Sequence, residues 1–189
     1  MPLLLPPPIE SPRLLLRIVQ EADLPDLMAV NGDDVTTRFL PYASWLTLAD
    51  AEAWLKRMTT AQETGASLQF VIVEKATQRV IGTCLLFRYD EGSRRAEVGY
   101  VLGRAHWRRG LMFEALTALL RYAFGEVGIR RLEAEVHPDN QGSNGVLQKC
   151  GFVREGLLRK RWTGKGETYD TYIYGLLADE WIFHSHEKR

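Results

Sequence analysis

The stretch AEVGYVLGRAHWRRGLMFEAL, residues 96–116, decides how this chain folds. Its first seven residues, 96–102, have the character of a β-strand that Gly103 ends, and an apolar helix then runs to about Glu126. RLEAEV, residues 131–136, follows as a strand of alternating polar and apolar residues. A strand, a helix and a second strand in this order predict a right-handed crossover between two parallel strands.

Arg108, Arg109 and Gly110 stand at the start of that helix, where free backbone N–H groups already create a positive end. A glycine lets a bulky oxyanion approach the backbone without meeting a Cβ, and guanidinium forks suit phosphate oxygens. The stretch therefore predicts an anion site at the helix N-terminus, with solvated arginines as the alternative. Neither a G-x-x-x-x-G-K-[ST] loop nor a G-x-G-x-x-G fingerprint is present.

The segments before residue 96 predict a strand, two helices and two further strands, at 13–19, 22–34, 47–65, 68–74 and 79–88. The last two strands form an antiparallel hairpin. The second helix begins with the capping pair Thr47 and Asp50, and its apolar face consists of Leu48, Ala51, Leu55 and Met58. Residues 33–46 show no regular pattern and are expected to form part of a substrate cleft with the last hairpin.

The segments after residue 136 predict a short helix and a closing hairpin, at 140–152, 156–162 and 168–177. Asn140 caps the helix and Gly151 closes it. The complete order, β-α-α-β-β-β-α-β-α-β-β, favours an α/β (α+β) fold in which one mixed sheet has helices on both faces.

The composition is that of an ordinary globular protein, with 189 residues, 46% hydrophobic and 25% charged. The 24 Lys and Arg residues balance 24 Asp and Glu residues, which argues against a nucleic-acid partner. No stretch approaches the roughly 18 apolar residues that a membrane span needs, so no membrane partner is expected. We expect a cytoplasmic monomer or homodimer.

One domain is expected at 13–183, between a proline-rich, partly disordered lead-in at 1–12 and a polar tail at 184–189. The lead-in lacks a basic start and its prolines interrupt the leucines, so it does not resemble a signal peptide. Cys84 and Cys150 lie far apart and outside any C-x-x-C motif. They are expected to be free thiols, with a disulfide as the alternative.

The stretch 96–116, followed by HPDNQGSNGVLQKCGF at 137–152, resembles the GNAT superfamily of acetyl-CoA-dependent N-acetyltransferases. The RimJ/RimL-type members, which acetylate protein N-termini, are the most similar. The resemblance extends from RLLLR at 13–17 to YGLLADEW at 174–181. It implies a mostly antiparallel mixed sheet in which strand 96–102 splays away from strand 131–136, with the pantetheine arm of acetyl-CoA in the gap.

The resemblance also implies which residues bind acetyl-CoA. Tyr100, Val101 and Leu102 would line the pantetheine arm, and the Leu102 backbone would hold the thioester carbonyl. The backbone N–H groups of Arg109, Gly110, Met112 and Phe113 would hold the pyrophosphate. The complete expected set is Tyr100, Val101, Leu102, Trp107, Arg108, Arg109, Gly110, Leu111, Met112, Phe113, Asn140 and Ser143.

The loop departs from the usual [QR]-x-x-G-x-[GA] pattern of the superfamily at two positions. Trp107 occupies the first, as is familiar in the Rim-like branch, and Met112 occupies the last. Either the Met112 side chain points into the core, which its flexible thioether tolerates, or it crowds the phosphate site and lowers cofactor affinity.

Acetyl transfer to an amine needs a neutral amine, a stabilised oxyanion and a proton for the leaving thiolate. The resemblance makes Glu97 the candidate proton acceptor, acting through water, and Ser143 the candidate proton donor to the thiolate. An α-amine has a pKa near 7.7–8.0, so about a tenth is already neutral at pH 7, whereas a lysine side chain is almost entirely charged. Acetylation of a protein N-terminus therefore requires less deprotonation of the amine by the enzyme than acetylation of a lysine side chain does.

Each assignment has a structural alternative. Glu97 would be a solvated strand residue that pairs with Arg95 or Arg131, and Asn140 and Ser143 would only cap a helix. Tyr100 is a second candidate hydroxyl, Tyr172 and Tyr174 are expected in the core or the cleft, and Glu114 suits a positive helix end. RKRW, residues 159–162, is expected to be a solvated hairpin edge, with contact to an acidic substrate as the alternative.

The four histidines, His106, His137, His184 and His186, form no metal-binding pattern, so no metal is expected. Three functions stay open. The first is acetylation of a protein N-terminal amine, with a ribosomal protein as the expected acceptor. The second is acetylation of a small amine, such as a polyamine, an amino acid or an antibiotic. The third is an acyl-CoA-binding module without turnover, which Met112 alone favours.

Overall fold

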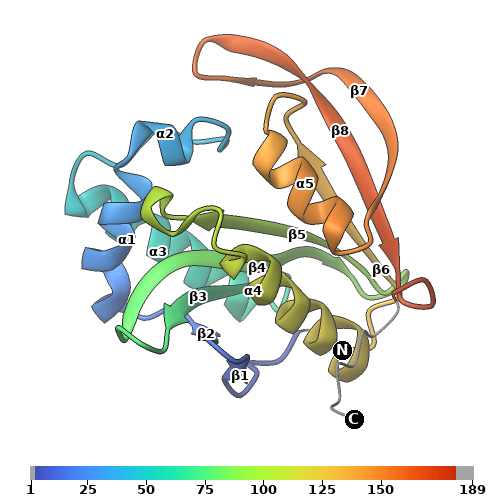
Figure 1. Ribbon diagram of the computed structural model, residues 1–189, viewed down its shortest axis with the longest axis horizontal. Coiled ribbons are helices and arrows are strands. Elements are labelled where there is room, and N and C mark those ends of the chain that lie inside the picture. Colours follow the sequence, from blue (N-terminus) through green and yellow to red (C-terminus); the bar gives the residue numbers. More distant parts are fainter. Residues whose placement is uncertain (1–2, 182–189) are drawn as a thin grey trace.

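The computed structural model describes residues 3–181, which form one eight-stranded sheet with helices on both faces (Figure 1). The strand order is β1-β2-β3-β4-β5-β6-β8-β7. The strands are β1 (Ile9–Glu10), β2 (Leu14–Ile18), β3 (Leu68–Glu74), β4 (Arg79–Asp90), β5 (Arg95–Leu102), β6 (Arg131–Val136), β7 (Val153–Gly164) and β8 (Glu167–Leu177). The helices are α1 (Leu24–Asn31), α2 (Asp34–Thr37), α3 (Leu48–Glu63), α4 (Leu111–Arg121) and α5 (Gln141–Lys149).

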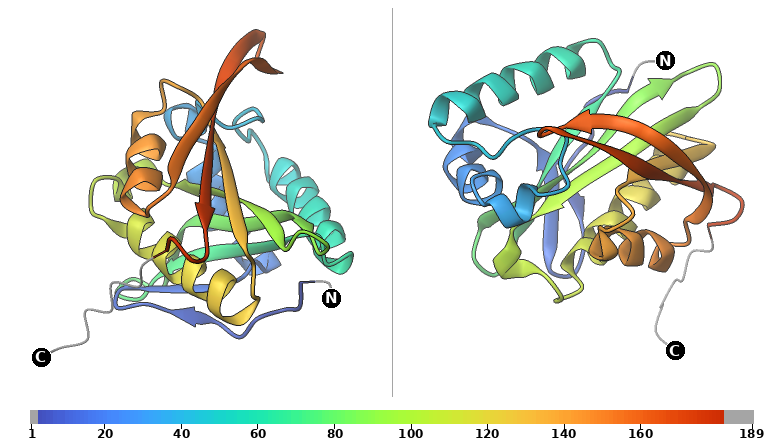
Figure 2. Two further views of the ribbon diagram at one scale, coloured as in Figure 1. Left: turned by 90° about the vertical axis from the view of Figure 1, so that its right-hand side faces the viewer. Right: turned by 90° about the horizontal axis from the view of Figure 1, so that it is seen from above.

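Strand β3 shows why helices cover both faces of the sheet. All seven of its residues are buried, which is the pattern of a strand with no solvated face. Phe70 and Ile72 pack in the cluster that contains the apolar side of α4, whereas Val71 and Val73 pack in the cluster that contains α1 and α3. The left view of Figure 2 places α3 and α5 on opposite sides of the strands.

Strands β5 and β6 are the only parallel neighbours in the described sheet, and they separate soon after they meet. Their pairing covers Arg95–Glu97 against Arg131–Glu133 and then stops. Strand β5 continues to Leu102 and β6 to Val136, so the strands diverge beyond the paired segment (Figure 1). The predicted mixed, mostly antiparallel sheet with a splayed strand pair is confirmed.

Local sequence signals account for the helix ends. The side chains of Thr47 and Asp50 form the capping box of α3, as predicted. Asn140 caps α5 by accepting a hydrogen bond from the Ser143 N–H at 3.1 Å. The helix predicted to reach Glu126 does so, but its last turn, Tyr122–Glu126, is π-helical.

Three expectations about the first third of the chain need correction. The lead-in is not loose over residues 3–12, because Leu3 is buried and Ile9–Glu10 pair with β2. Residues 33–46 contain the short helix α2. On the predicted apolar face of α3, Ala51 is buried and Leu55 and Met58 pack partly buried against the same cluster, but Leu48 is about half exposed. Trp54, which packs on Trp45, is the second fully buried side chain of this helix.

Cys84 and Cys150 are both free and buried, so the disulfide alternative is wrong. Their burial raises the pKa of both thiols, that of Cys150 to about 12. Among residues 3–181 no helix combines the length and the apolar character needed to cross a bilayer. The predicted domain limits at 13 and 183 stay predictions, and the predicted tail at 184–189 lies outside the described residues.

Candidate active site

The N-terminus of α4 forms a bare backbone cradle around Gly110. Gly110 has a left-handed φ of 75°, which a glycine adopts without strain. A Cβ added there would meet only the Arg13 guanidinium, at 3.7 Å. The N–H groups of the first helical turn have no partner within the helix, so the cradle can take an anion such as a diphosphate.

Arg13, which the sequence did not single out, fixes the orientation of this cradle. Its Nη1 donates to the Arg109 carbonyl at 3.0 Å, and its Nε donates to Glu114 at 2.6 Å. In a trans peptide the N–H points away from the carbonyl, so this contact turns the Gly110 N–H away from Arg13. Burial opposes ionisation of Glu114, but the hydrogen bonds from Arg13 and Ser11 outweigh it and lower the Glu114 pKa.

The two arginines of the loop, whose guanidinium groups were both predicted to suit phosphate oxygens, behave differently from each other. Arg109 donates to Glu74 on β3 at 2.8 Å and contacts His106 Nδ1 at 3.2 Å, so its guanidinium fastens the loop to the sheet. Arg108 is exposed and has a positive φ of 58°. Arg109 is therefore placed to offer its backbone rather than its side chain, and Arg108 is left to offer its charge.

Met112 does not crowd the cradle. Its side chain is 7% exposed and belongs to the core cluster that α4 covers, as does that of Leu111. Phe113 is partly buried against the same cluster. The departure from the glycine or alanine of the family pattern therefore leaves the backbone accessible, and it no longer favours a module without turnover.

Leu102 points its backbone polar groups into the gap between β5 and β6. In an antiparallel ladder alternate residues turn to the same neighbour, and the Gly103 N–H donates to Ile81 on β4. Leu102 must therefore face the other way, and its carbonyl accepts from Trp107 Nε1 at 2.6 Å on that side. Its N–H has the orientation that the predicted thioester contact requires.

Tyr100 and Ser143 bring two hydroxyl groups together across the same gap. The Tyr100 hydroxyl lies 2.6 Å from Ser143 Oγ and 3.3 Å from the Ser143 carbonyl oxygen. Burial raises the pKa of Tyr100, so its hydroxyl keeps its proton at neutral pH. Either hydroxyl can give a proton to a leaving group in the gap, which joins two residues that the sequence treated as separate candidates.

The start of α5 is held against β8 by Asn144, another residue that the sequence did not single out. Its side-chain amide donates to the carbonyls of His137, Pro138 and Asn140 and accepts from the Tyr174 hydroxyl at 2.8 Å. Tyr174 is thus a core residue, 1% exposed, that positions Asn140 and Ser143 through Asn144. Tyr172 is partly buried against the same core.

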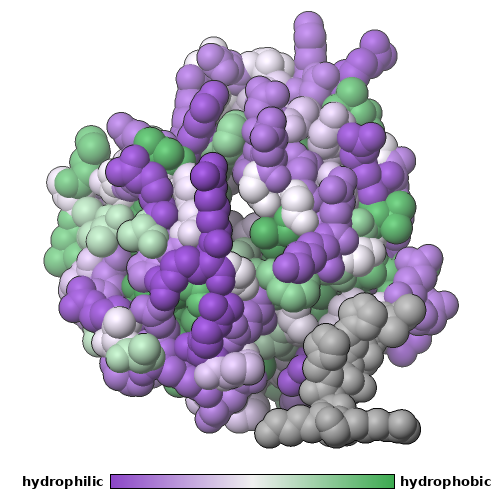
Figure 3. Space-filling view, in the orientation of Figure 1, coloured by the Kyte–Doolittle hydropathy of each residue, from purple (hydrophilic) through white to green (hydrophobic). Residues whose placement is uncertain are grey.

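A cavity of about 420 Å³ lies on the face of the sheet that α3 covers, opposite to the face covered by α4. It is located where β5 and β6 diverge. Figure 3 shows a hollow between α2 and α5 with a largely hydrophilic rim. The cavity is lined by residues 39–42, by α3, by one face of β4, β5 and β6, and by the closing hairpin, and it includes Val101, Asn140 and Ser143. A cavity between residues 33–46 and the last hairpin is thus present as expected, and its role as a substrate cleft stays a prediction.

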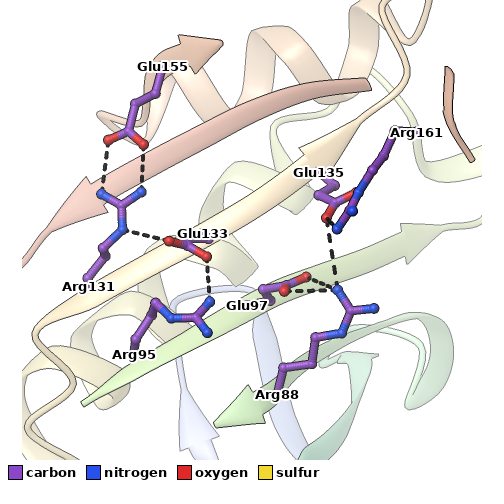
Figure 4. A network of polar contacts seen from close by, with 8 residues as sticks. All are labelled: Arg88, Arg95, Glu97, Arg131, Glu133, Glu135, Glu155 and Arg161. Atoms are coloured by element: carbon purple, nitrogen blue, oxygen red, sulfur yellow. Dashed lines mark hydrogen bonds and ion pairs between the residues drawn. The ribbon is translucent and has the colours of Figure 1, made fainter. Parts of the chain in front are cut away.

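Glu97 lies in this cavity and is not a solvated strand residue. It is 7% exposed, and its two carboxylate oxygens accept from Arg88 Nη1 at 3.0 and 3.1 Å (Figure 4). The expected alternative partners, Arg95 and Arg131, pair with Glu133 instead. Arg88 has a φ of 51° and lies at a bulge between Phe87 and Asp90, which turns it toward the cavity.

Glu135 is a second carboxylate in the cavity, and the sequence analysis missed it. It accepts from Trp162 Nε1 at 2.6 Å and from Arg161 at 3.0 Å. RKRW is therefore not only a solvated edge, because Trp162 lines the cavity and Arg161 pairs with Glu135. The alternation of β6 was the available signal, since Glu133 and Glu135 share the face opposite to Leu132, Ala134 and Val136.

The hairpin tip reaches over the cavity to α2. Lys165 Nζ donates to the Thr37 carbonyl at 2.7 Å, and burial lowers the Lys165 pKa. The His137 ring packs between those of Phe39 and Tyr169 in tilted contacts, with ring centroids 5.0 and 4.9 Å away. These contacts connect the hairpin tip to α2 and form a roof over the cavity. Within residues 3–181 no three His, Cys, Asp or Glu side chains gather as a metal site would require, and His184 and His186 lie outside that range.

Comparison with known proteins agrees with this geometry. A family model described as an acetyltransferase (GNAT) domain matches residues 13–153. The chain is similar to the uncharacterised N-acetyltransferase p20 of Bacillus licheniformis, with 34% identity over 169 residues, 89% of this chain and 95% of that protein. It is also similar to the ribosomal protein uS5-alanine N-acetyltransferase of Escherichia coli strain K12, with 28% identity over 185 residues and 92% of each chain covered.

The fold also matches solved structures. A GCN5-related N-acetyltransferase from Brucella melitensis superposes with a TM-score of 0.83 at 28% identity, over 95% of this chain and 83% of that chain. The resemblance inferred from the loop and helix motifs is therefore confirmed over nearly the whole chain.

Proposed function

The chain belongs to the GNAT family of acetyltransferases and is an N-acetyltransferase, and from this premise we propose that it acetylates the N-terminal α-amine of a protein. Acetyl-CoA is the proposed co-substrate, and a ribosomal protein is the proposed acceptor. The observation that supports this most directly is that the cavity of Glu97 extends along the diverging ends of β5 and β6 to Val101 and Ser143, close in the chain to the Gly110 cradle that follows β5.

The residues present fit acetyl-CoA. The cradle at Gly110 has open space beside it, and the backbone N–H groups of Arg109, Gly110, Met112 and Phe113 would hold the diphosphate. Tyr100, Val101 and Leu102 would line the arm, with the remaining contacts from Trp107, Arg108, Leu111, Asn140 and Ser143. When bound, acetyl-CoA supplies an activated acetyl group as a thioester.

The chain's own groups move the protons of the reaction. Glu97 takes the proton of the acceptor amine, directly or through water, because its carboxylate is buried in the acceptor cavity. Ser143 Oγ, hydrogen-bonded to the Tyr100 hydroxyl, gives a proton to the thiolate. Overall an N–C bond forms, a C–S bond breaks, and one proton passes from nitrogen to sulfur. An acceptor that arrives as an ammonium cation first gives up one further proton, which Glu97 passes to solvent.

The likeness to the uS5-alanine acetyltransferase, together with the roof over the cavity, supports a protein N-terminus as acceptor. A free chain end is thin enough to enter from the side below the roof. A small amine is the second candidate, because two carboxylates and several aromatic rings in one cavity also suit a small cation.

A thiol-release assay across N-terminal peptides and small amines tests the proposal. We expect turnover with unblocked peptides and none with the same peptides acetylated beforehand. If every peptide fails while a polyamine or an antibiotic turns over, the acceptor is a small amine and the protein N-terminus is wrong. Gly110→Val tests the cradle, since a branched side chain at a φ of 75° should raise the KM for acetyl-CoA at least about tenfold.

A further inference from the structure

Glu97 and Glu135 stand on either side of the point where β5 and β6 separate. Glu97 lies opposite Glu133 in the last paired position, and Glu135 follows two residues along the same face. Arg88 Nη1 lies 3.0 and 3.1 Å from the two oxygens of Glu97 and 3.9 Å from Glu135 Oε1 (Figure 4). One cationic nitrogen thus already occupies the space between two carboxylates inside the acceptor cavity.

The hydrogen bonds between Arg88 and Glu97 have a weak geometry. A single nitrogen makes both of its hydrogen bonds to Glu97, whereas Arg131 meets Glu155 with two parallel bonds of 2.9 and 2.6 Å. Two parallel bonds form the stronger arrangement of a guanidinium and a carboxylate. The Arg88 side chain is also 47% exposed, so it can leave Glu97 without breaking a packed core.

Thr171 indicates independently that the cavity takes a polar ligand. Its side chain is 2% exposed and lines the same cavity, and its hydroxyl has no hydrogen-bond partner among the described residues. It lies on β8 two residues from Ile173, which pairs with Glu135. A buried hydroxyl without a partner is costly, and a polar group bound beside Glu135 would satisfy it.

We propose that Glu97 and Glu135 together form the seat of the acceptor's ammonium group and that Arg88 fills this seat until the acceptor arrives. The inference rests on the proposed function. At neutral pH about nine-tenths of an α-amine is protonated, so the acceptor arrives as a cation. The carboxylates of Glu97 and Glu135 are already balanced by the guanidinium groups of Arg88 and Arg161. Binding of the acceptor's ammonium group would add one uncompensated positive charge, unless Arg88 moves out of the cavity.

Arg88→Met tests the seat, with Arg95→Met as the matched control. Both variants remove a guanidinium that hydrogen-bonds a glutamate on this face, but Glu97 lines the cavity and Glu133 does not. With a peptide that turns over, we expect Arg88→Met to lower the KM for the acceptor about tenfold, because the amine no longer competes with Arg88. The KM for acetyl-CoA should stay within twofold, and Arg95→Met should leave both constants unchanged.

Glu135→Gln provides the converse test. It should raise the acceptor KM about tenfold and change kcat less than threefold, which a purely structural role of Glu135 would not produce. An unchanged or raised acceptor KM in Arg88→Met, or an unchanged one in Glu135→Gln, overturns the seat.

Inhibition by methylguanidinium, which carries the head group of arginine, tests the proposal in the unaltered enzyme, so the test does not depend on a variant that folds. In the unaltered enzyme it should inhibit competitively against the acceptor and not against acetyl-CoA. Absence of inhibition, or competition with acetyl-CoA, contradicts the seat. If no acceptor releases thiol at all, the proposed function fails instead, so the two failures are distinguishable.

Discussion

Strands β5 and β6 carry the same arginine–glutamate chemistry at two places, and the chemistry has a different use in each (Figure 4). Where the strands are paired, Arg95, Glu133, Arg131 and Glu155 form a continuous ladder from β5 to β7. From the last paired position onward, Glu97, which pairs with Arg88, and Glu135, which pairs with Arg161, line a cavity.

The arginine–glutamate ladder of Arg95, Glu133, Arg131 and Glu155, here called the paired end, is rigid, and the region of Glu97 and Glu135 is called the open end. The Arg131–Glu155 fork lies across β8 directly over Gly175, where any Cβ would overlap both side chains. The ladder therefore fixes the place at which the strands begin to diverge. The open end has a cavity of about 420 Å³ in front of it, so the same residue types are accessible to a ligand there. The comparison teaches that strand pairing, rather than residue type, decides which ion pairs are structural.

The largest effect should come from Glu97→Gln, which removes the proposed proton acceptor with almost no change in volume. We expect kcat to fall about 100-fold or more while acetyl-CoA still binds, since general base catalysis contributes on that scale. Thiol release and titration calorimetry measure the two quantities. Glu133→Gln, one strand away at the paired end, should keep kcat within threefold. Equal losses in both variants would erase the distinction between the two ends.

Arg131→Met should have the next largest effect, and on stability rather than on turnover. It removes both the fork to Glu155 and the bond to Glu133 and leaves two carboxylates without their main partner. We expect the free energy of unfolding at pH 7 to fall by about 2 kcal/mol in urea, with kcat at 25 °C unchanged. A loss of turnover without a loss of stability would show that the paired end also serves the reaction.

Ser143→Ala tests the hydroxyl pair of the open end and should lower kcat about tenfold. Tyr100→Phe removes the other hydroxyl, and the two changes together should cost little more than one alone, because the groups act as a unit. Binding of acetyl-CoA serves as the control. Fully multiplicative losses in the double variant would mean that the two hydroxyls act independently.

The smallest expected effect is a pH dependence of stability from the paired end. The hydrogen bond from Arg131 lowers the Glu155 pKa, and in Glu133 the bonds from Arg131 and Arg95 lower the pKa against the opposing effect of burial. A carboxyl whose pKa is lower in the folded state stabilises the fold above its unfolded pKa, here 4.5, and loses this contribution as the pH falls through the folded value. The urea midpoint should therefore drop between about pH 5 and pH 3.

Arg131→Met supplies the control for that pH series. Without the arginine the two carboxyls titrate more nearly as they do in the unfolded chain, so the midpoint should depend less steeply on pH. An identical slope in the variant would locate the acid sensitivity elsewhere in the molecule, for instance at Glu114 or Glu74, whose pKa values are also lowered.

Much of the fold followed from local patterns in the sequence. The strand at 131–136, the capping pair Thr47 and Asp50, and the glycine start of α4 each depend on residues within one turn or one strand of each other. The order of elements and the cradle at Gly110 could therefore be predicted. Ile9–Glu10 and α2 could not, because segments this short are stabilised by what they pack against.

Local patterns and family motifs were enough to predict the cradle, the strand–helix–strand unit that carries it, and Glu97 and Ser143 as candidate site residues. The partners of Glu97 depend instead on how distant segments pack together. Arg88 points into the cavity because a bulge in β4 breaks the alternation of that strand, and Glu135 and Trp162 join it from elements far along the chain. The physical reason is that periodicity specifies the face on which a residue lies, whereas the partner it meets depends on the register and twist of strands that pair at long range.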